Sequence, residues 1–410
     1  MLPSLASLRC DTETPVRRRE GPDVETNSPK RARKERKTPI LVNGEWVRHY
    51  RHAPLDDASI KRARDLLTYG TQAKAEAVAA MYGPVAEWDT SEVQNFSRLF
   101  SGMKNFTADL SGWDVGNVTT MRGMFYSARS FTSDLSRWNV GQVRDMESMF
   151  DGARSFTSDL SRWNVGKVER MYSMFSGAES FTSDLSRWNV GNVEDMSAMF
   201  YNARSFTSDL SKWKVGKVKW MSATFQGAER FMSDLSKWNV GNVQTMGRMF
   251  SGARSFTSDL SKWNVGNVKR MGDMFSRAES FTSDLSRWNV GNVKEMQNMF
   301  FGARSFTSDL SRWDVGKVES MNGTFLGAER FMSDLSGWNV RNVELMDLMF
   351  EDALSFGPPL VLSHGSGWTP ESLAKHLAFV ESSDDLKTYR AMRRWREVRE
   401  LWYVARSVVR

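Results

Sequence analysis

Tryptophan returns every 25 residues through the middle of this chain, and this spacing constrains the fold more than any other feature. Eleven tryptophans keep the period, at positions 88, 113, 138, 163, 188, 213, 238, 263, 288, 313 and 338. The unit that starts at Trp138 reads WNVGQVRDMESMFDGARSFTSDLSR, and the other units are variants of it. Short repeats of this kind are typical of solenoids, in which each unit buries its apolar edge only against its neighbours. We therefore predict a stack of eleven coils.

Each unit combines two apolar patterns. One run of apolar residues is separated by steps of three, three, one and three positions, which predicts one face of a short helix: Val143, Met146, Met149, Phe150 and Ala153. The second half of the unit is rich in β-compatible residues, so we expect a short strand near residues 159–163 with a bulge or turn in it. One short strand and one short helix per coil is the layout of leucine-rich repeats. The predicted fold class is therefore an α/β repeat solenoid that is leucine-rich-repeat-like, with helical caps.

The large apolar residues of the unit are interpreted as core. Eleven exposed indoles would favour aggregation, whereas a buried indole fills volume and its N–H finds a carbonyl. The alternative is an exposed aromatic strip that stacks on sugars or bases. The predicted core of the representative unit is Trp138, Val143, Met146, Met149, Phe150, Ala153, Phe156 and Leu160.

Composition divides the chain into four regions. Residues 1–40 are polar, charged and contain proline, which predicts a disordered basic tail. Residues 41–87 are predicted to form a helical N-terminal cap, 88–362 the solenoid, and 363–410 a helical C-terminal cap. The basic, aromatic stretch 393–410 is interpreted as a docking cap, with a membrane-surface or partner helix as the alternative.

The net charge of +7 comes from the tails. Residues 1–40 hold ten basic against six acidic residues, and residues 363–410 hold nine against six, so the middle of the chain is balanced. This balance weakens the case for a nucleic-acid track along the body. A basic cluster in the first tail resembles a bipartite nuclear-import signal, with a merely solvated tail as the alternative: Lys30, Arg31, Arg33, Lys34, Arg36 and Lys37.

Because the units align, each template position becomes a column along the stack. A basic residue precedes the tryptophan in eight units and forms the candidate partner-binding column: Arg137, Arg162, Arg187, Lys212, Lys237, Lys262, Arg287 and Arg312. Three residues earlier, ten units carry aspartate, from Asp109 to Asp334. Like charges at strand spacing repel, so we interpret the two columns as neutralising each other, with aspartate capping a turn. A charged partner-binding face is the alternative. A third column alternates Arg and Glu from Arg154 to Glu329, which predicts weak ion pairs between coils.

Catalysis and metal binding have little support in the sequence. A catalytic site needs unlike groups held together in one pocket, and all four histidines lie outside the coils: His49, His52, His364 and His376. The single cysteine, Cys10, allows neither an intrachain disulfide nor a Cys-rich metal site. One carboxylate per coil is too few for calcium, which takes roughly six to eight oxygen ligands. We expect no enzyme, no cofactor and no metal.

Targeting signals are equally scarce. No apolar run reaches the roughly 18 residues of a membrane span, and the N-terminal stretch does not have the pattern of a cleavable secretory signal. A cytoplasmic or nuclear location is therefore favoured over the cell surface.

The repeat template resembles a known family. The string W-[DN]-V-x-x-V-x-x-M-x-x-M-F-x-x-A-x-x-F-x-x-D-L-S resembles the Trp/Met/Phe-rich branch of the BspA-like leucine-rich-repeat surface proteins, catalogued as a domain of unknown function. The lead-in at residues 82–91 is similar to the eukaryotic form of that family, and the resemblance covers residues 82–356. Most units have glycine, as at Gly141, where the family usually has serine. The resemblance implies a solenoid used for adhesion or protein binding, without catalytic residues.

Two functional hypotheses follow. The favoured one is a non-enzymatic repeat scaffold for protein–protein interaction or adhesion, which presents an extended repetitive face to a protein partner. The alternative is a nuclear or nucleic-acid-associated protein that acts through the basic tails and the Arg/Lys column. Affinity for nucleic acid that falls steeply with salt would favour the alternative.

Overall fold

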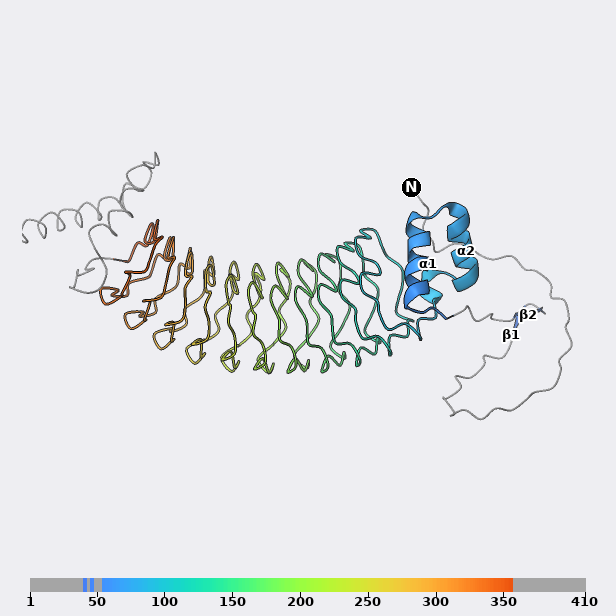
Figure 1. Ribbon diagram of the computed structural model, residues 1–410, viewed down its shortest axis with the longest axis horizontal. Helices are drawn as coiled ribbons and strands as arrows, with labels where there is room; N and C mark the ends of the chain where they lie inside the picture. The colour runs from blue at the N-terminus through green and yellow to red at the C-terminus, as the bar shows by residue number, and fades with distance from the viewer. Residues whose placement is uncertain (1–39, 43–44, 48–53, 357–410) are drawn as a thin grey trace, which may run out of the picture.

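A computed structural model describes residues 40–42, 45–47 and 54–356. Within these residues, the helices and strands all precede the repeats: the antiparallel hairpin of β1 (Ile40–Val42) and β2 (Glu45–Val47), the helices α1 (Asp57–Tyr69) and α2 (Gln72–Tyr82), and the 3-10 turn η1 (Val85–Glu87). A long stack of coils follows (Figure 1). The predicted basic tail with its import cluster, and the predicted C-terminal cap, lie outside the described residues.

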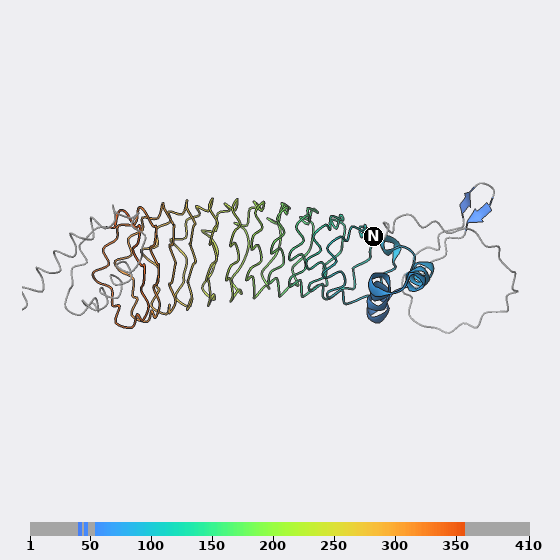
Figure 2. The ribbon, with the colours of Figure 1, turned by 90° about the horizontal axis from the view of Figure 1, so that it is seen from above.

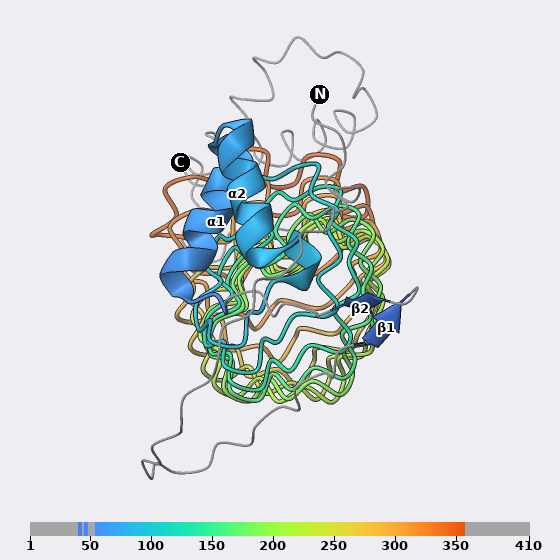
Figure 3. The same ribbon diagram turned by 90° about the vertical axis from the view of Figure 1, so that its right-hand side faces the viewer.

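Helices α1 and α2 lie across the N-terminal end of the stack (Figures 1 and 3). Helix α1 starts at Asp56, whose Oδ1 accepts hydrogen bonds from the backbone N–H of Ala58 (3.1 Å) and Ser59 (2.7 Å), while the Ser59 hydroxyl reaches back to the N–H of Asp56. This reciprocal capping box fixes where the helix begins. Buried Leu55 and Ile60 join the same hydrophobic core as the coils.

Asp57 connects this cap to the first coil. Its Oδ1 accepts hydrogen bonds from the backbone N–H groups of Gln94 (2.8 Å) and Asn95 (2.9 Å). In the next coil the equivalent N–H, on Thr119, donates to the carbonyl of Gln94, one coil earlier (2.8 Å). The first coil has no earlier coil to supply that carbonyl, so the Asp57 carboxylate takes its place.

The coils are joined along one edge by a ladder of backbone hydrogen bonds. In the unit at Trp138, the N–H groups of Met146, Ser148, Phe150 and Gly152 donate to carbonyls of the next coil at 2.7–3.1 Å. Between them, the N–H groups of Met149 and Ala153 donate three residues back, to Met146 and Phe150. We call residues 144–152 of this unit, and their equivalents, the ladder segment. Its regular parallel pairing is confined to one bridge per coil, such as Asp145↔Arg170.

The predicted helix in each unit is wrong. The ladder segment is a series of turns, in which Ser148 has φ of 53° and Gly152 has φ of 71°. A right-handed helix excludes residues with positive φ. A four-residue turn, closed by a hydrogen bond from its fourth N–H to its first carbonyl, accepts positive φ at its third residue. Three-residue apolar spacing fits consecutive turns as well as it fits a helix, because the two ends of each turn point inward. Glycine at the Gly152 position, in the middle of the predicted helix, argued against a helix.

The predicted strand is also misplaced, although the turn expected in this segment is present. Residues 159–163 form a turn closed by the N–H of Trp163 on the carbonyl of Leu160 (3.0 Å), with no ladder pairing among the described coils. Parallel pairing instead lies in the segment predicted to be helical. Leucine at position 160 and tryptophan at position 163 both point inward because a turn, unlike a flat strand, brings its first and fourth residues to the same side.

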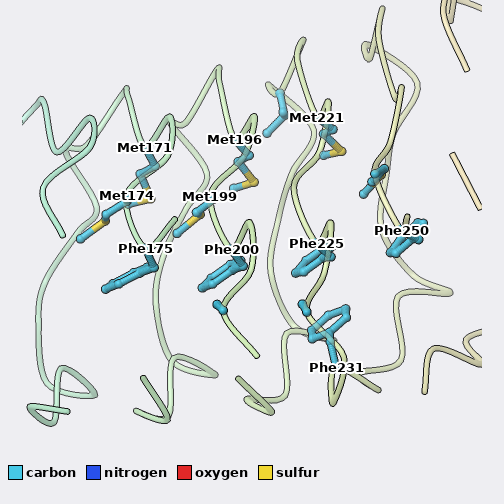
Figure 4. Close-up of a cluster of buried hydrophobic side chains, with 14 of the residues drawn as sticks. Met171, Met174, Phe175, Met196, Met199, Phe200, Met221, Phe225, Phe231 and Phe250 are labelled. Atoms are coloured by element: carbon cyan, nitrogen blue, oxygen red, sulfur yellow. The ribbon is translucent and has the colours of Figure 1, made fainter. Parts of the chain in front are cut away.

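The core consists of columns of identical side chains stacked from coil to coil (Figure 4). Each of the eight predicted core residues is buried, with Trp138 the most exposed at 4%. Phe150 stacks on Phe156 within its coil at 3.9 Å between ring centroids, and on Phe175 of the next coil at 5.6 Å. Each buried indole N–H is satisfied, as where Trp138 Nε1 donates to the carbonyl of Leu110 at 3.0 Å. This burial rules out the exposed aromatic strip.

The coils fan apart away from the ladder. Hydrogen-bonded strands lie about 4.8 Å apart, but equivalent rings lie 5.7 Å apart at Phe175–Phe200 and 6.5 Å apart at Trp188–Trp213. The tryptophan column, with the wider spacing, therefore lies on the outer side of a curve, and the ladder segment lies on the inner side. The bow is visible in Figure 1 and largely absent from the perpendicular view of Figure 2.

Candidate partner-binding surface

The predicted partner-binding column lies on the surface. All eight basic residues, from Arg137 to Arg312, are exposed, and none forms an ion pair with another described residue. The aspartates three positions earlier cap turns, as predicted: Asp134 Oδ1 accepts from the N–H of Ser136 at 2.9 Å. That hydrogen bond is the main reason why the pKa of Asp134 is lowered, and the charge of Arg137 is a smaller cause. The two columns therefore balance in charge without direct pairing.

A serine column that the sequence analysis missed completes these turns. Ser158 is buried; its Oγ accepts from the N–H of Leu135 in the previous coil (2.8 Å) and donates to Asp134 Oδ1 (3.2 Å). The same relay recurs along the stack, up to Ser333. The available signal was the first unit, where Ala108 replaces serine. No earlier coil offers it a partner.

The alternating Arg/Glu column forms separate ion pairs. Its members meet at 3.2–3.6 Å in Arg154–Glu179, Arg204–Glu229, Arg254–Glu279 and Arg304–Glu329. All eight side chains are at least 40% exposed, so each pair contributes at most about 1 kcal/mol. The column therefore helps to hold neighbouring coils in register and offers no distinct site.

Variation between units is concentrated on the outward side of the ladder segment. We call the positions of Arg144, Asp145, Glu147, Ser148 and Asp151, with their equivalents in every coil, the ladder face. The Glu147 position reads, along the stack, Ser, Arg, Glu, Tyr, Ser, Ser, Gly, Gly, Gln, Asn and Asp. The Asp159 position, by contrast, is aspartate in ten units. A face whose side chains differ from coil to coil can recognise a partner of irregular shape, which a uniform column cannot.

Exposed aromatic residues also gather on the ladder face. Among the described coils, the most exposed are Tyr126 (45%), Tyr172 (42%) and Trp220 (39%), and all three occupy ladder-face positions. Lys219 lies over the Trp220 ring at 5.7 Å. Aromatic residues are enriched where proteins bind one another and often dominate the binding energy. This face is not evident from the sequence, because the uniform columns repeat and the variable positions do not.

A hollow of about 590 Å³ opens on the ladder face near the middle of the stack. Small residues form its floor at two adjacent positions: Ser173, Ala198 and Ala223 at one, and Ser222, Gly247 and Gly272 at the other. Its remaining lining includes Tyr172, Tyr201, Gln226 and Gln297, together with charged side chains. The hollow therefore exists because neighbouring coils lack the long side chains found at these positions elsewhere, such as Arg122 and Glu147.

The charged groups around the hollow are largely paired. Arg248 contacts Asp273 at 3.4 Å, and Arg270 contacts Glu295 at 3.2 Å. Asp151 is the fifth charged group, and burial raises the pKa of its carboxyl. With two arginines and three carboxylates, the hollow has no excess of positive charge.

Within the described residues, no three His, Cys, Asp or Glu side chains converge as a metal site would require. The described helices, α1 and α2, are too short and polar to cross a bilayer.

Comparison with known families gives one match, repeated along the chain. A family model described as "Mycoplasma protein of unknown function, DUF285" matches residues 71–188, 134–231, 173–286, 207–311 and 273–386. Together these overlapping matches span residues 71–386, which is more than half of the sequence and includes all of the described coils. No curated protein matches the sequence.

Among solved structures, one match is a chain of the "Crystal structure of TLR13-ssRNA13 complex". It is 11% identical, and the alignment covers 69% of this chain and about half (51%) of that chain, with a TM-score of 0.20. A superposition as loose as this carries no weight for either fold or function.

Proposed function

Since the chain belongs to the family of proteins of unknown function named DUF285, whose description assigns no activity, we propose from the geometry that it is a non-enzymatic scaffold that binds a protein through its ladder face. The observation that carries this proposal is the coincidence of three features on one face: variable positions, exposed aromatic residues and the hollow. A rigid, repetitive core holds this face in a fixed curve. Resemblance of the repeat to BspA-like leucine-rich-repeat proteins adds adhesion as one form that such binding takes.

Polarity supports a protein partner over a nucleic acid. Binding of nucleic acid depends on clusters of unpaired Lys and Arg that neutralise phosphates. Along the ladder face, basic and acidic residues are mixed and several of them pair, as in Arg144–Glu169 (3.1 Å) and Lys219–Glu194 (2.9 Å). A mixed, paired surface with aromatic residues is typical of protein recognition.

Two sets of variants of the full chain test which face binds. A photo-crosslinking residue is placed at Trp220 on the ladder face or at Lys212 in the basic column, and each variant is incubated with extract from the cells that produce the protein. We expect a discrete crosslinked protein from position 220, lost when Tyr172 and Tyr126 are both changed to alanine, and none from position 212. Crosslinking at position 212 alone, or binding only to DNA or RNA with steep salt dependence, would contradict the proposal.

A further inference from the structure

The ladder face contains backbone N–H groups that side chains cap in some coils and leave open in others. At the Glu147 position, the side chain two residues earlier supplies the cap: Asn95 Oδ1 accepts from Ser97 N–H at 2.8 Å, and Asp145 Oδ1 accepts from Glu147 N–H at 3.0 Å. The backbone repeats from coil to coil, so the N–H at this position points toward the ladder face in every coil.

Among the described coils, five in a row, from Ser222 to Asn322, lack this cap, and the first four of these residues line the hollow. The N–H groups of Ser222, Gly247 and Gly272 have no hydrogen-bond partner within the described chain. Two residues before them lie Trp220, Thr245 and Arg270. Tryptophan and arginine have no acceptor atom to offer. Thr245 Oγ1 accepts from the hydroxyl of Ser222 at 3.0 Å rather than from the N–H of Gly247. Because Ser222 and Gly247 have small side chains and are only partly buried, the hollow exposes their two backbone donors, whereas Gly272 is buried beneath the Gln297 amide.

The hollow also contains an acceptor without a donor. Gln297 Oε1 is buried and has no hydrogen-bond partner in the described chain. Its amide lies against the backbone of Gly272, because a Cβ added to that glycine would meet Gln297 Nε2 at 2.5 Å. An unsatisfied buried polar group costs free energy, so an occupant that donates to Gln297 is favoured over one that only accepts.

We propose that this hollow binds an amide of the protein partner, either a main-chain peptide group or an Asn or Gln side chain. The amide oxygen accepts from the N–H groups of Ser222 and Gly247, and the amide N–H donates to Gln297 Oε1 when the Gln297 side chain turns toward it. The chain already shows the first half of this geometry, since amide oxygens of Asn95 and Asn322 cap Ser97 and Asp347, each at 2.8 Å. The inference rests on the proposed function and names the chemistry that the face recognises.

A carboxylate fits the hollow less well than an amide. It accepts hydrogen bonds but cannot donate to Gln297, and it would face the carboxylates of Asp151, Asp273 and Glu295. Two arginines are present, but each is already paired. A neutral group that both donates and accepts matches all of these features.

The experiment titrates small probes into the full-length, deuterated and ¹⁵N-labelled protein and follows backbone amide shifts by NMR. The probes are N-acetylglycine methylamide, which has two peptide groups, and acetate and inorganic phosphate, which are anions. We expect the amide probe to give saturable shifts at Ser222 and Gly247, with weaker or no effect from the anions. Equal or larger shifts with acetate or phosphate would show an anion site and overturn the proposal, as would the absence of shifts with every probe.

Variants that supply the missing cap from within the chain sharpen this test. Trp220→Asn with Thr245→Asn places amide oxygens where Asn95 has one, so that Ser222 and Gly247 are capped, and we expect probe affinity to fall about tenfold. Ser320→Asn makes the same change at the same position outside the hollow and is expected to leave affinity unchanged. Gln297→Met removes the acceptor, and an unchanged preference for amide over acetate in that variant would refute its role. Crosslinking at position 220 with no probe binding would reject this inference and leave the proposed function standing.

Discussion

Replacing Ser208 by alanine tests how much one buried hydroxyl contributes to a coil. Ser208 Oγ accepts from the N–H of Leu185 at 2.8 Å and donates to Asp184 Oδ1 at 3.3 Å. Alanine keeps the packing but leaves a buried N–H without a partner, which costs about 1–3 kcal/mol. The hydrogen bond to Asp184 adds little, because that carboxylate is exposed and still accepts from the N–H of Ser186.

Urea unfolding followed by tryptophan fluorescence measures this loss, and hydrogen exchange shows where it occurs. Coils that contact only their neighbours lose stability locally, so we expect faster exchange in residues 184–210 than in distant coils. Thr207→Ala, at an exposed neighbouring position, is the control and should change stability by less than about 0.5 kcal/mol. Ala108→Ser adds the hydroxyl in the one unit that has no earlier Leu–Asp pair, and it should add no stability. Equal effects of Ser208→Ala and Thr207→Ala would refute the relay.

Three further outcomes are expected. Lowering pH should destabilise the array only below the unfolded aspartate pKa of about 3.9. Hydrogen bonds from Ser136, Ser161 and their equivalents lower the folded-state pKa of the aspartate column, so its stabilisation is present above that pH and is lost as pH falls through the folded pKa values. Acid titration by circular dichroism measures this, and a loss of stability between roughly pH 5 and neutrality would contradict it. Asp57→Ala should cost about 1–3 kcal/mol by uncapping Gln94 and Asn95, with Asp57→Asn losing less, as thermal melts and exchange of the first coil would show. Phe200→Ala should cost about 3–5 kcal/mol, because its ring is buried and stacks on Phe206 at 4.0 Å, whereas the exposed Met232→Thr should be nearly neutral by the same urea assay.

Sequence reasoning reached the repeat and its interior but not the conformation of the backbone. Tryptophan at a fixed period of 25 residues and apolar residues such as Met146 and Phe150 identify what is buried, because burial depends mainly on side-chain chemistry. The same spacing of three positions fits a helix and a series of turns, so the pattern alone could not separate them. Glycine at position 152 favoured turns, and its left-handed φ of 71° explains why.

The candidate site was harder to predict for a physical reason. Uniform columns such as Asp134 and Arg137 draw attention because they repeat, but repetition here serves the turns and the core. Residues that distinguish one coil from another, such as Trp220 and Gly247, show their common face only when the coils are stacked. The hollow arises from the absence of side chains at consecutive positions, and absence becomes visible only in three dimensions.

The division of labour within each coil has a consequence for how such a chain changes over time. Inward positions repeat almost without variation. The ladder joins backbone to backbone, so these hydrogen bonds form whichever side chains the ladder face carries. If the ladder face binds a partner as proposed, a substitution there changes binding more than it changes the core or the backbone ladder. Gaining or losing a whole unit would lengthen or shorten the stack by one coil while the same backbone pairing continued, so the side chains on the ladder face could change without a change in the core.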